Sequence, residues 1–379
     1  MFLRDKHLKC KCCGCEACEF VCEPHALQME TDEEGFSYPI LSEEKCTKCN
    51  YCTTVCPLES VPNKVDEELQ GILAVRLNDK EKLMQSQSGG AFTALAEVAF
   101  AEVAIVYGVA LIDREAVYIR CESLEQLPPV KGSKYVQAEL RDTYKQIKSD
   151  LQKGLTVLFV GTPCYVHGLF SWLDFLKVDT SRLCGVDLVC FGVASPLIVK
   201  EYLQYLDRHY KVRISEYNYR DKAFGWKGSY ESFRVNGKLE FRRSLLAKLY
   251  NDRLSIRPSC YFCNYTSFDR VSDITIGDFW GIEKIHPELD DNKGVSLVMV
   301  NTSKGREWFE KIKDNLTIEV SNREDCAQPR LKSPSMLPKV RALFWNDYRN
   351  NSFDALIEKY AYDSFAKRVV GFFLRLLSK

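Results

Sequence analysis

Eight of the seventeen cysteines form two runs of identical spacing near the start of the chain. Each run follows the pattern C-x2-C-x2-C-x3-C, and Pro57 directly follows the second run. Three thiolates two residues apart can bind one iron–sulfur cube, while the fourth thiolate reaches across to another cube. We therefore expect two 4Fe-4S clusters, one held by Cys12, Cys15, Cys18 and Cys56, and the other by Cys22, Cys46, Cys49 and Cys52.

Structural zinc is the alternative, because C-x2-C pairs also bind zinc. A zinc ion needs only four ligands, so the regular third and fourth cysteines of each run would have no use. Two features depart from the ferredoxin pattern: Pro24 stands two places after Cys22, and Cys10 and Cys13 are surplus. Over about residues 8–60 the segment resembles a bacterial two-cluster ferredoxin.

Four further cysteines lie at places where a second kind of site can form. Cys164 and Cys190 each follow an apolar segment with the composition of a strand. The carboxyl ends of neighbouring parallel strands share one edge of a sheet, so we expect these two thiols to be neighbours. Cys260 and Cys263 form a C-x2-C pair in a loop. Spacing alone leaves open whether the four form one set or are separate buried cysteines.

Strand-like and helix-like segments alternate from residue 86 onward. Residues 155–160 and 186–189 are expected strands, and residues 196–210 an expected helix with Ser195 as its N-cap. This alternation favours an α/β layer with parallel strand pairs. Residues 58–82 are polar and predict a linker, and the chain after Lys304 is expected to be helical.

The composition excludes several classes of protein. The 379 residues are 46% apolar, enough for two ordinary domains. Lys and Arg total 52, as do Asp and Glu, so we expect no nucleic-acid partner. No signal peptide or membrane-spanning segment is evident, and the odd number of cysteines argues against a disulfide scaffold. We expect a cytoplasmic protein.

Seven short motifs, taken in order, resemble the coenzyme F-420 hydrogenase/dehydrogenase beta-subunit family. The resemblance covers about residues 70–320. It implies a bound FAD and a third 4Fe-4S cluster on Cys164, Cys190, Cys260 and Cys263. The motifs are residues 86–91, 132–135, 161–164, 190–192, 220–222, the pair at 260 and 263, and 272–281.

Residue types in these motifs suit a flavin. Ser88, Gly89 and Gly90 precede a helix, where free N–H groups can face a phosphate. Lys134 can pair with a phosphate, Tyr135 can stack, and Asp278 offers an acceptor. Taken singly, the glycines favour an ordinary tight turn and Lys134 a solvated lysine, and strand-end packing is the alternative for Asp278.

The pair Asp221 and Lys222, and the single residue His167, each have a functional and an ordinary structural interpretation. Asp221 and Lys222 are expected to form no more than an exposed ion pair. His167 follows Cys164 by three residues, and proton transfer is less expected there than an ordinary satisfied histidine.

The predicted fold is α+β or α/β and has three parts. A small ferredoxin-like domain with two 4Fe-4S clusters covers residues 1–62, and a mixed α/β flavin-binding domain covers residues 70–320. A helical C-terminal region covers residues 321–379. Its last segment has apolar residues at helical spacing among basic ones, which fits docking on the protein core or peripheral contact with the inner face of a membrane. The apolar positions are Phe365, Val369, Phe372, Phe373, Leu376 and Leu377.

Together these features predict an iron–sulfur flavoprotein oxidoreductase. Electrons would pass between an external carrier (ferredoxin, flavodoxin or reduced deazaflavin), the clusters and FAD. The substrate would be a small or lipid-linked molecule, with polysaccharide biosynthesis as one setting that the resemblance implies. The alternatives are a non-catalytic electron-transfer subunit for a separate enzyme and an F-420-dependent dehydrogenase subunit.

Overall fold

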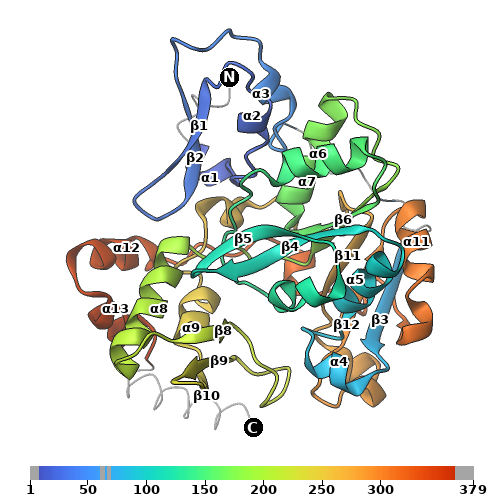
Figure 1. Ribbon diagram of the computed structural model, residues 1–379. Helices are drawn as coiled ribbons and strands as arrows, with labels where there is room; N and C mark the ends of the chain where they lie inside the picture. Colours follow the sequence, from blue (N-terminus) through green and yellow to red (C-terminus); the bar gives the residue numbers. More distant parts are fainter. Residues whose placement is uncertain (1–7, 60–64, 66–69, 363–379) are drawn as a thin grey trace.

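An eight-stranded mixed sheet forms the centre of the computed structural model, which describes residues 8–59, 65 and 70–362 (Figure 1). Strands β4, β6, β7 and β11 are parallel to one another, and the strands outside them pair antiparallel. The fold is therefore mixed α/β. The sheet order is β13 (Leu316–Val320), β3 (Gly71–Leu77), β12 (Ser296–Val300), β11 (Ile274–Asp278), β7 (Leu183–Leu188), β6 (Val157–Gly161), β4 (Ile105–Ile112) and β5 (Glu115–Cys121).

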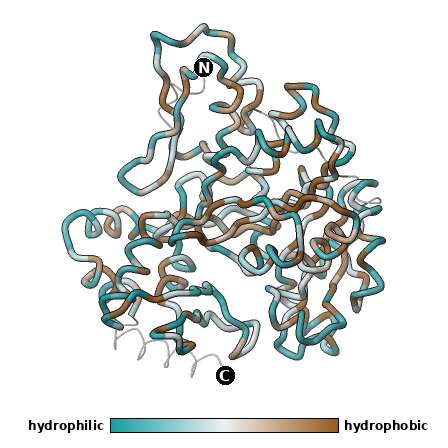
Figure 2. The backbone as a smooth tube through the Cα atoms, in the orientation of Figure 1, coloured by the Kyte–Doolittle hydropathy of each residue, from teal (hydrophilic) through white to brown (hydrophobic). Residues whose placement is uncertain are grey.

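Helices cover both faces of this sheet because its central strands are apolar on both sides. Tyr107 and Phe159 belong to one buried cluster, whereas Val106 and Leu158, their chain neighbours, belong to the other. Figure 2 shows hydrophobic residues concentrated along the sheet and the helices packed against it. The first cluster includes α6 (Thr143–Gln152), α7 (Pro163–Phe175) and α8 (Pro196–Tyr210), and the second includes α5 (Ala91–Ala101) and α11 (Ser303–Glu310).

The cysteine-rich segment forms a small unit above the sheet (Figure 1, top). It packs on α6 and α7 through aromatic rings, since the Phe20 ring lies 5.0 Å from Tyr144 and 5.8 Å from Trp172. Its elements are α1 (Leu8–Lys11), α2 (Ala17–Phe20), the hairpin of β1 (Leu27–Thr31) and β2 (Ser37–Leu41), and α3 (Tyr51–Thr54).

A second group of elements lies at the other side of the sheet from α5 and α11 (Figure 1). It contains a small antiparallel sheet and helices that pack on α8. The strands are β8 (Ser215–Asn218), β9 (Tyr230–Val235) and β10 (Lys238–Arg243), and the helices are α9 (Leu245–Asn251), α12 (Arg341–Asn350) and α13 (Phe353–Tyr360). The short helices α4 (Lys80–Met84) and α10 (Ile282–Ile285) follow β3 and β11.

Some expectations from the sequence are confirmed and others are wrong. Ser195 caps α8 as expected, since its Oγ accepts from the Ile198 N–H at 3.3 Å. The expected linker at 58–82 instead contains β3, a mostly apolar strand in the sheet. The chain after Lys304 is not helical throughout, because β13 pairs with β3 at the sheet edge. Both errors arose because a short strand shows its role only through its partner strands.

The C-terminal segment at 365–377 lies outside the described residues, so its docking or membrane contact stays a prediction. Within the described ranges, the helices are too short or too polar for any to cross a membrane.

Gly89, which precedes α5, lies close to the backbone of the paired strands β3 and β12. A Cβ added at Gly89 would lie 2.1 Å from Val75 O and 2.5 Å from Ser296 N. Both atoms belong to backbone within the sheet, so neither can move aside without breaking strand pairing. At Gly71, in the same strand as Val75, an added Cβ would meet only Val300 at 3.5 Å.

We therefore expect Gly89→Ala to lower the free energy of unfolding by about 3 kcal/mol or more, because it overpacks against rigid backbone. The matched variant Gly71→Ala should change it by less than about 1 kcal/mol. Urea unfolding followed by circular dichroism measures both. Equal stabilities for the two variants would contradict the packing.

Candidate functional site

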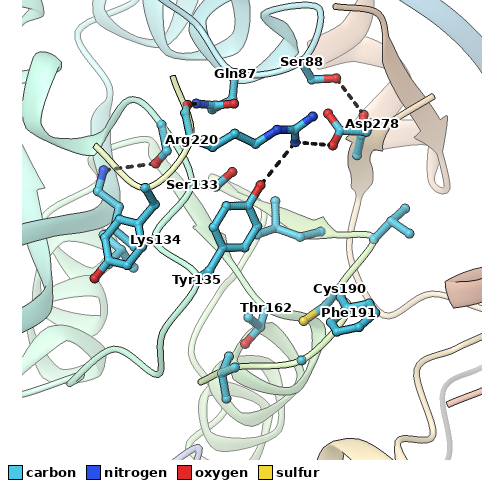
Figure 3. Close-up of a pocket in the computed structure, with 18 of the residues that line it drawn as sticks. Gln87, Ser88, Ser133, Lys134, Tyr135, Thr162, Cys190, Phe191, Arg220 and Asp278 are labelled. Carbon is cyan, nitrogen blue, oxygen red and sulfur yellow. Dashed lines mark hydrogen bonds and ion pairs between the residues drawn. The ribbon is translucent and has the colours of Figure 1, made fainter. Parts of the chain in front are cut away.

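A cavity of about 750 Å³ opens at the carboxyl ends of β6, β7 and β11. Gly161, Leu188 and Asp278 end these strands and line it. In α/β sheets this edge is where ligands bind, because the loops diverge there and leave a crevice. Figure 3 shows Gln87, Ser88, Arg220 and Asp278 at one end of the cavity, and Thr162, Cys190 and Phe191 at the other.

Four thiols gather beside the end of the cavity that contains Cys190. Cys164 lies in the first turn of α7, and Cys260 and Cys263 belong to a short 3-10 segment (Pro258–Phe262) and the residue after it. Burial raises the pKa of Cys190, and so do the charges of Cys260, Cys164 and Cys263. Burial likewise raises the pKa of Cys260 to about 12 and that of Cys263 to about 11. These four cysteines thus share one environment, in which a bound cation would stabilise the thiolates.

The eight thiols of the N-terminal runs are divided between two places. Cys22, Cys46, Cys49 and Cys52 line a small hollow. The charges of Cys12 and Cys56 raise the pKa of Cys18, and those of Cys56 and Cys18 raise the pKa of Cys15, so these four thiols lie near one another. The last cysteine of each run therefore lies with the first three of the other run. This is the distribution that two cubes need, and the donor sets fit such clusters.

No three His, Cys, Asp or Glu side chains in the described part of the chain meet closely enough to hold a single metal ion. A cube differs in this respect, because its four thiolates bind four separate irons and stand further apart.

Cys13, surplus in the sequence pattern, lies between the N-terminal thiols and the cavity-side set. Its thiol lies close enough to those of Cys15 and Cys164 for both to affect its pKa. Cys49 is exposed, Cys12, Cys18 and Cys56 are buried, and the four cavity-side cysteines are partly exposed. The thiol sets consequently form a series from the surface of the N-terminal unit to the cavity.

Arg257 holds the N-terminal unit against the cavity-side loop, and sequence reasoning missed it. Its side chain is fully buried. Nε donates to Cys12 O at 2.8 Å, Nη2 to Ser37 O at 2.8 Å, and Nη1 to Gln137 Oε1 at 2.7 Å. The guanidinium also lies 4.2 Å from the centre of the Tyr38 ring. Because Arg257 stands three residues before Cys260, one side chain fixes the distance between two thiol sets.

Two backbone N–H groups of the glycine motif are already bound within the protein. The Gly89 N–H donates to Ser296 Oγ at 2.8 Å, and the Gly90 N–H donates to Gln87 O at 3.0 Å. Neither glycine lines the cavity, whereas Ser88 does. The two glycines therefore allow close packing, and the wall of the cavity is made by their neighbours.

Lys134, Tyr135 and Asp278 all line the cavity, but protein groups already bind them. Lys134 Nζ donates to three carbonyls of its own loop, and burial lowers its pKa to about 7. Arg220 Nη1 donates to Asp278 Oδ2 at 2.6 Å and to Tyr135 OH at 3.2 Å (Figure 3). Trp226 Nε1 donates to the other oxygen of Asp278.

Arg220 is thus the centre of the polar network at this end of the cavity. Its guanidinium lies 5.3 Å from the centre of the Trp280 ring, which stacks on Trp226 at 4.9 Å and 4°. The sequence offered Arg220 only as part of a short motif, with no sign of these partners.

Four residues that line the cavity each have one buried polar atom without a partner among the described residues. Native proteins rarely leave such atoms unsatisfied, so a cluster of them at a cavity indicates a missing partner. The volume also falls in the range of about 300–1,000 Å³ that small-molecule and cofactor sites occupy. A flavin cofactor fits these two properties. The unpartnered atoms at the cavity are Gln87 Oε1, Tyr219 OH, Arg253 Nε and Arg330 Nε.

The contacts of Lys222 and His167 decide between the interpretations that the sequence left for these two residues. Lys222 is not in an exposed ion pair with Asp221, because it is 4% exposed and Nζ donates to Leu83 O and Ser88 O at 2.7 and 2.6 Å. Asp221 instead accepts from Ser232 Oγ. His167 Nδ1 lies 2.8 Å from Tyr265 OH, and burial lowers its pKa to about 4, so the ring is neutral at pH 7. It is a satisfied histidine away from the cavity.

Three sets of four thiols, one of them beside a cavity, in a mixed α/β fold are typical of an iron–sulfur protein. Two family models match the chain accordingly. Residues 11–60 match the 4Fe-4S dicluster domain. Residues 154–325 match the C terminus of the coenzyme F420 hydrogenase/dehydrogenase beta subunit. Both matches agree with the resemblance that the motifs indicated.

Among solved structures, a chain of the xenon-derivatized F420-reducing [NiFe] hydrogenase complex from Methanosarcina barkeri is similar at 17% identity. The match covers 77% of this chain and 94% of that chain, with a TM-score of 0.45. The comparison with curated proteins gave no match.

Arg257→Gln should lower the free energy of unfolding by about 3 kcal/mol or more, because it leaves Cys12 O and Ser37 O buried without donors. Hydrogen exchange should accelerate chiefly in residues 8–59. The control is Arg234→Gln, which removes an exposed arginine paired with Glu216 on the surface. Unchanged exchange in residues 8–59 would refute the role of Arg257.

The burial of Lys222 predicts a pH dependence of stability. Its pKa falls from 10.5 to about 7 on folding, so between these values the unfolded chain binds a proton that the folded chain lacks. The free energy of unfolding should therefore rise with pH from 7 to 10.5, by at most about 1.4 kcal/mol per pH unit for this group. Lys222→Met should flatten that slope in urea unfolding between pH 7 and pH 10, whereas Lys238→Met, at an exposed site, should leave it unchanged.

Proposed function

We propose that this protein is an iron–sulfur flavoprotein oxidoreductase that passes electrons between an external carrier and a substrate in the cavity. The observation that carries the proposal is that Cys190 lines the cavity and is grouped with Cys164, Cys260 and Cys263, while Cys13 lies close to both Cys15 and Cys164. The family matches support it, because both models describe domains of electron-transfer proteins.

In this proposal the N-terminal sets hold two 4Fe-4S clusters, the cavity-side set holds a third, and the cavity holds FAD. Such clusters supply one-electron steps, and a flavin supplies storage of two electrons and exchange with a two-electron substrate. Cys49, which is exposed, marks the set that faces an external carrier. Candidate carriers are a ferredoxin, a flavodoxin or a reduced deazaflavin.

The protein side chains prepare the cavity for this chemistry. Arg220 neutralises Asp278 and orients Tyr135, so that the polar wall keeps a fixed geometry. Trp280 and Trp226 form a flat apolar surface beside these groups. The cavity volume suits a small molecule or the head of a lipid-linked one, including an intermediate of polysaccharide biosynthesis.

Iron and flavin analysis of anaerobically purified protein tests the proposal. We expect about twelve irons and one FAD in the wild type, since each cube contains four irons. Cys190→Ser should retain about eight irons, because only the cavity-side cluster loses a ligand. Cys10→Ser, which removes a cysteine outside the three sets, should retain about twelve.

Eight irons in both the wild type and Cys190→Ser would exclude a cluster on the cavity-side thiols. Absence of flavin from the purified protein and no binding of added FAD would exclude the flavoprotein. A protein that exchanges electrons with a carrier but reduces no compound unless a partner enzyme is added would be a carrier subunit.

A further inference from the structure

Arg253 and Arg330 lie together at the thiol end of the cavity. Their guanidinium carbons are 5.8 and 5.5 Å from the centre of the Phe191 ring, and Phe191 directly follows Cys190. Both arginines line the cavity. Burial, together with the positive charge of Arg253, lowers the pKa of Arg330. The two positive charges are therefore close enough to repel each other.

These two arginines are the cavity cations that lack an anionic partner among the described residues. Of the charged side chains lining the cavity, Asp278 is the one carboxylate in the described part of the chain, and it is bound by Arg220. Lys227 is paired with Glu283 and Asp290, and Lys134 is bound by carbonyls. The other cations of the cavity are thus already compensated.

Both guanidinium groups nevertheless have N–H donors without an acceptor among the described residues. Arg253 makes no side-chain hydrogen bond or ion pair within the described residues, and its Nε is buried. Arg330 donates from Nη1 to Ser335 Oγ at 2.9 Å, while its own Nε is buried without a partner. Buried N–H groups of this kind require an acceptor, and a guanidinium accommodates phosphate and carboxylate oxygens best.

Both arginines are held in place by backbone features. Arg253 has a φ of 63°, a left-handed conformation that is unfavourable for a side chain of this size, just after α9. Its carbonyl accepts from Tyr261 OH. Arg330 lies in a 3-10 segment (Pro329–Leu331), and Ser335 Oγ, which binds it, also donates to Phe191 O. The pair is therefore a preorganised feature of the cavity wall.

We propose that Arg253 and Arg330 form an oxyanion site, which binds a phosphate or carboxylate group of the ligand at the cavity end next to Cys190. The anion would accept hydrogen bonds from the two guanidinium groups and lie beside two positive charges that no carboxylate of the cavity compensates. The identity of the ligand rests on the proposed function: the oxyanion belongs either to the pyrophosphate of FAD or to the compound that exchanges electrons with the flavin.

Isothermal titration calorimetry with inorganic pyrophosphate, at constant ionic strength, tests the site on the full iron-loaded chain without flavin. We expect wild type to bind, and Arg253→Gln/Arg330→Gln to bind at least tenfold more weakly, because both charge-assisted donors are lost. Arg234→Gln, with the same charge change at an exposed position on β9, should bind within twofold of wild type. If the double variant fails to fold, Arg253→Gln alone carries the test, since its side chain supports no hydrogen bond.

Absent binding by wild type, or equal binding by wild type and the arginine variants, would overturn the oxyanion site. FAD and riboflavin then distinguish the two sources of the anion. If the pair binds the flavin pyrophosphate, the double variant loses affinity for FAD but retains that for riboflavin. If it binds a second compound, FAD affinity is unchanged and pyrophosphate still binds the FAD-loaded protein. Arginine-dependent pyrophosphate binding without any FAD binding would refute the proposed function and leave the site standing.

Discussion

The fully buried guanidinium of Arg257 is the contact on which the arrangement of thiol sets depends. It donates to backbone carbonyls of Cys12 and Ser37 from a loop that also carries Cys260. A buried arginine is costly unless its donors are satisfied, and here carbonyls, an amide and two aromatic rings satisfy it. The N-terminal unit is consequently attached to the cavity-side loop through specific polar contacts in addition to apolar packing.

This attachment brings the N-terminal thiols near the sheet edge that carries Cys164 and Cys190. The parallel strands β6 and β7 bring Cys164 and Cys190 to the same edge, and the fixed N-terminal unit places Cys13 beside Cys164. A series of one-electron centres works only when neighbouring centres are held at constant separation, which rigid packing supplies. The proposed electron path is thus a consequence of two constraints, strand direction and the burial of Arg257.

Charge compensation divides the cavity into two ends. At one end Arg220 and Asp278 neutralise each other, and Trp226 completes the hydrogen bonding of the carboxylate. At the other, Arg253 and Arg330 remain without a carboxylate among the described residues. A ligand that is neutral or aromatic at one end and anionic at the other matches this distribution, because it leaves no buried charge uncompensated.

The sequence by itself predicted the grouping of the N-terminal thiols, since ligand spacing is a local property of the chain. Spacing left open whether the four later cysteines form one set, and only the resemblance of the motifs implied that they do. It also predicted the mixed α/β class from alternating segments, but not β3 or β13. Tertiary structure alone decided which polar groups were already occupied. Lys134 and Gly89 have the residue types of a phosphate site, yet nearby carbonyls and Ser296 bind them. A buried donor binds whichever acceptor lies near it once distant segments have packed together. The local sequence pattern does not specify which acceptor that is.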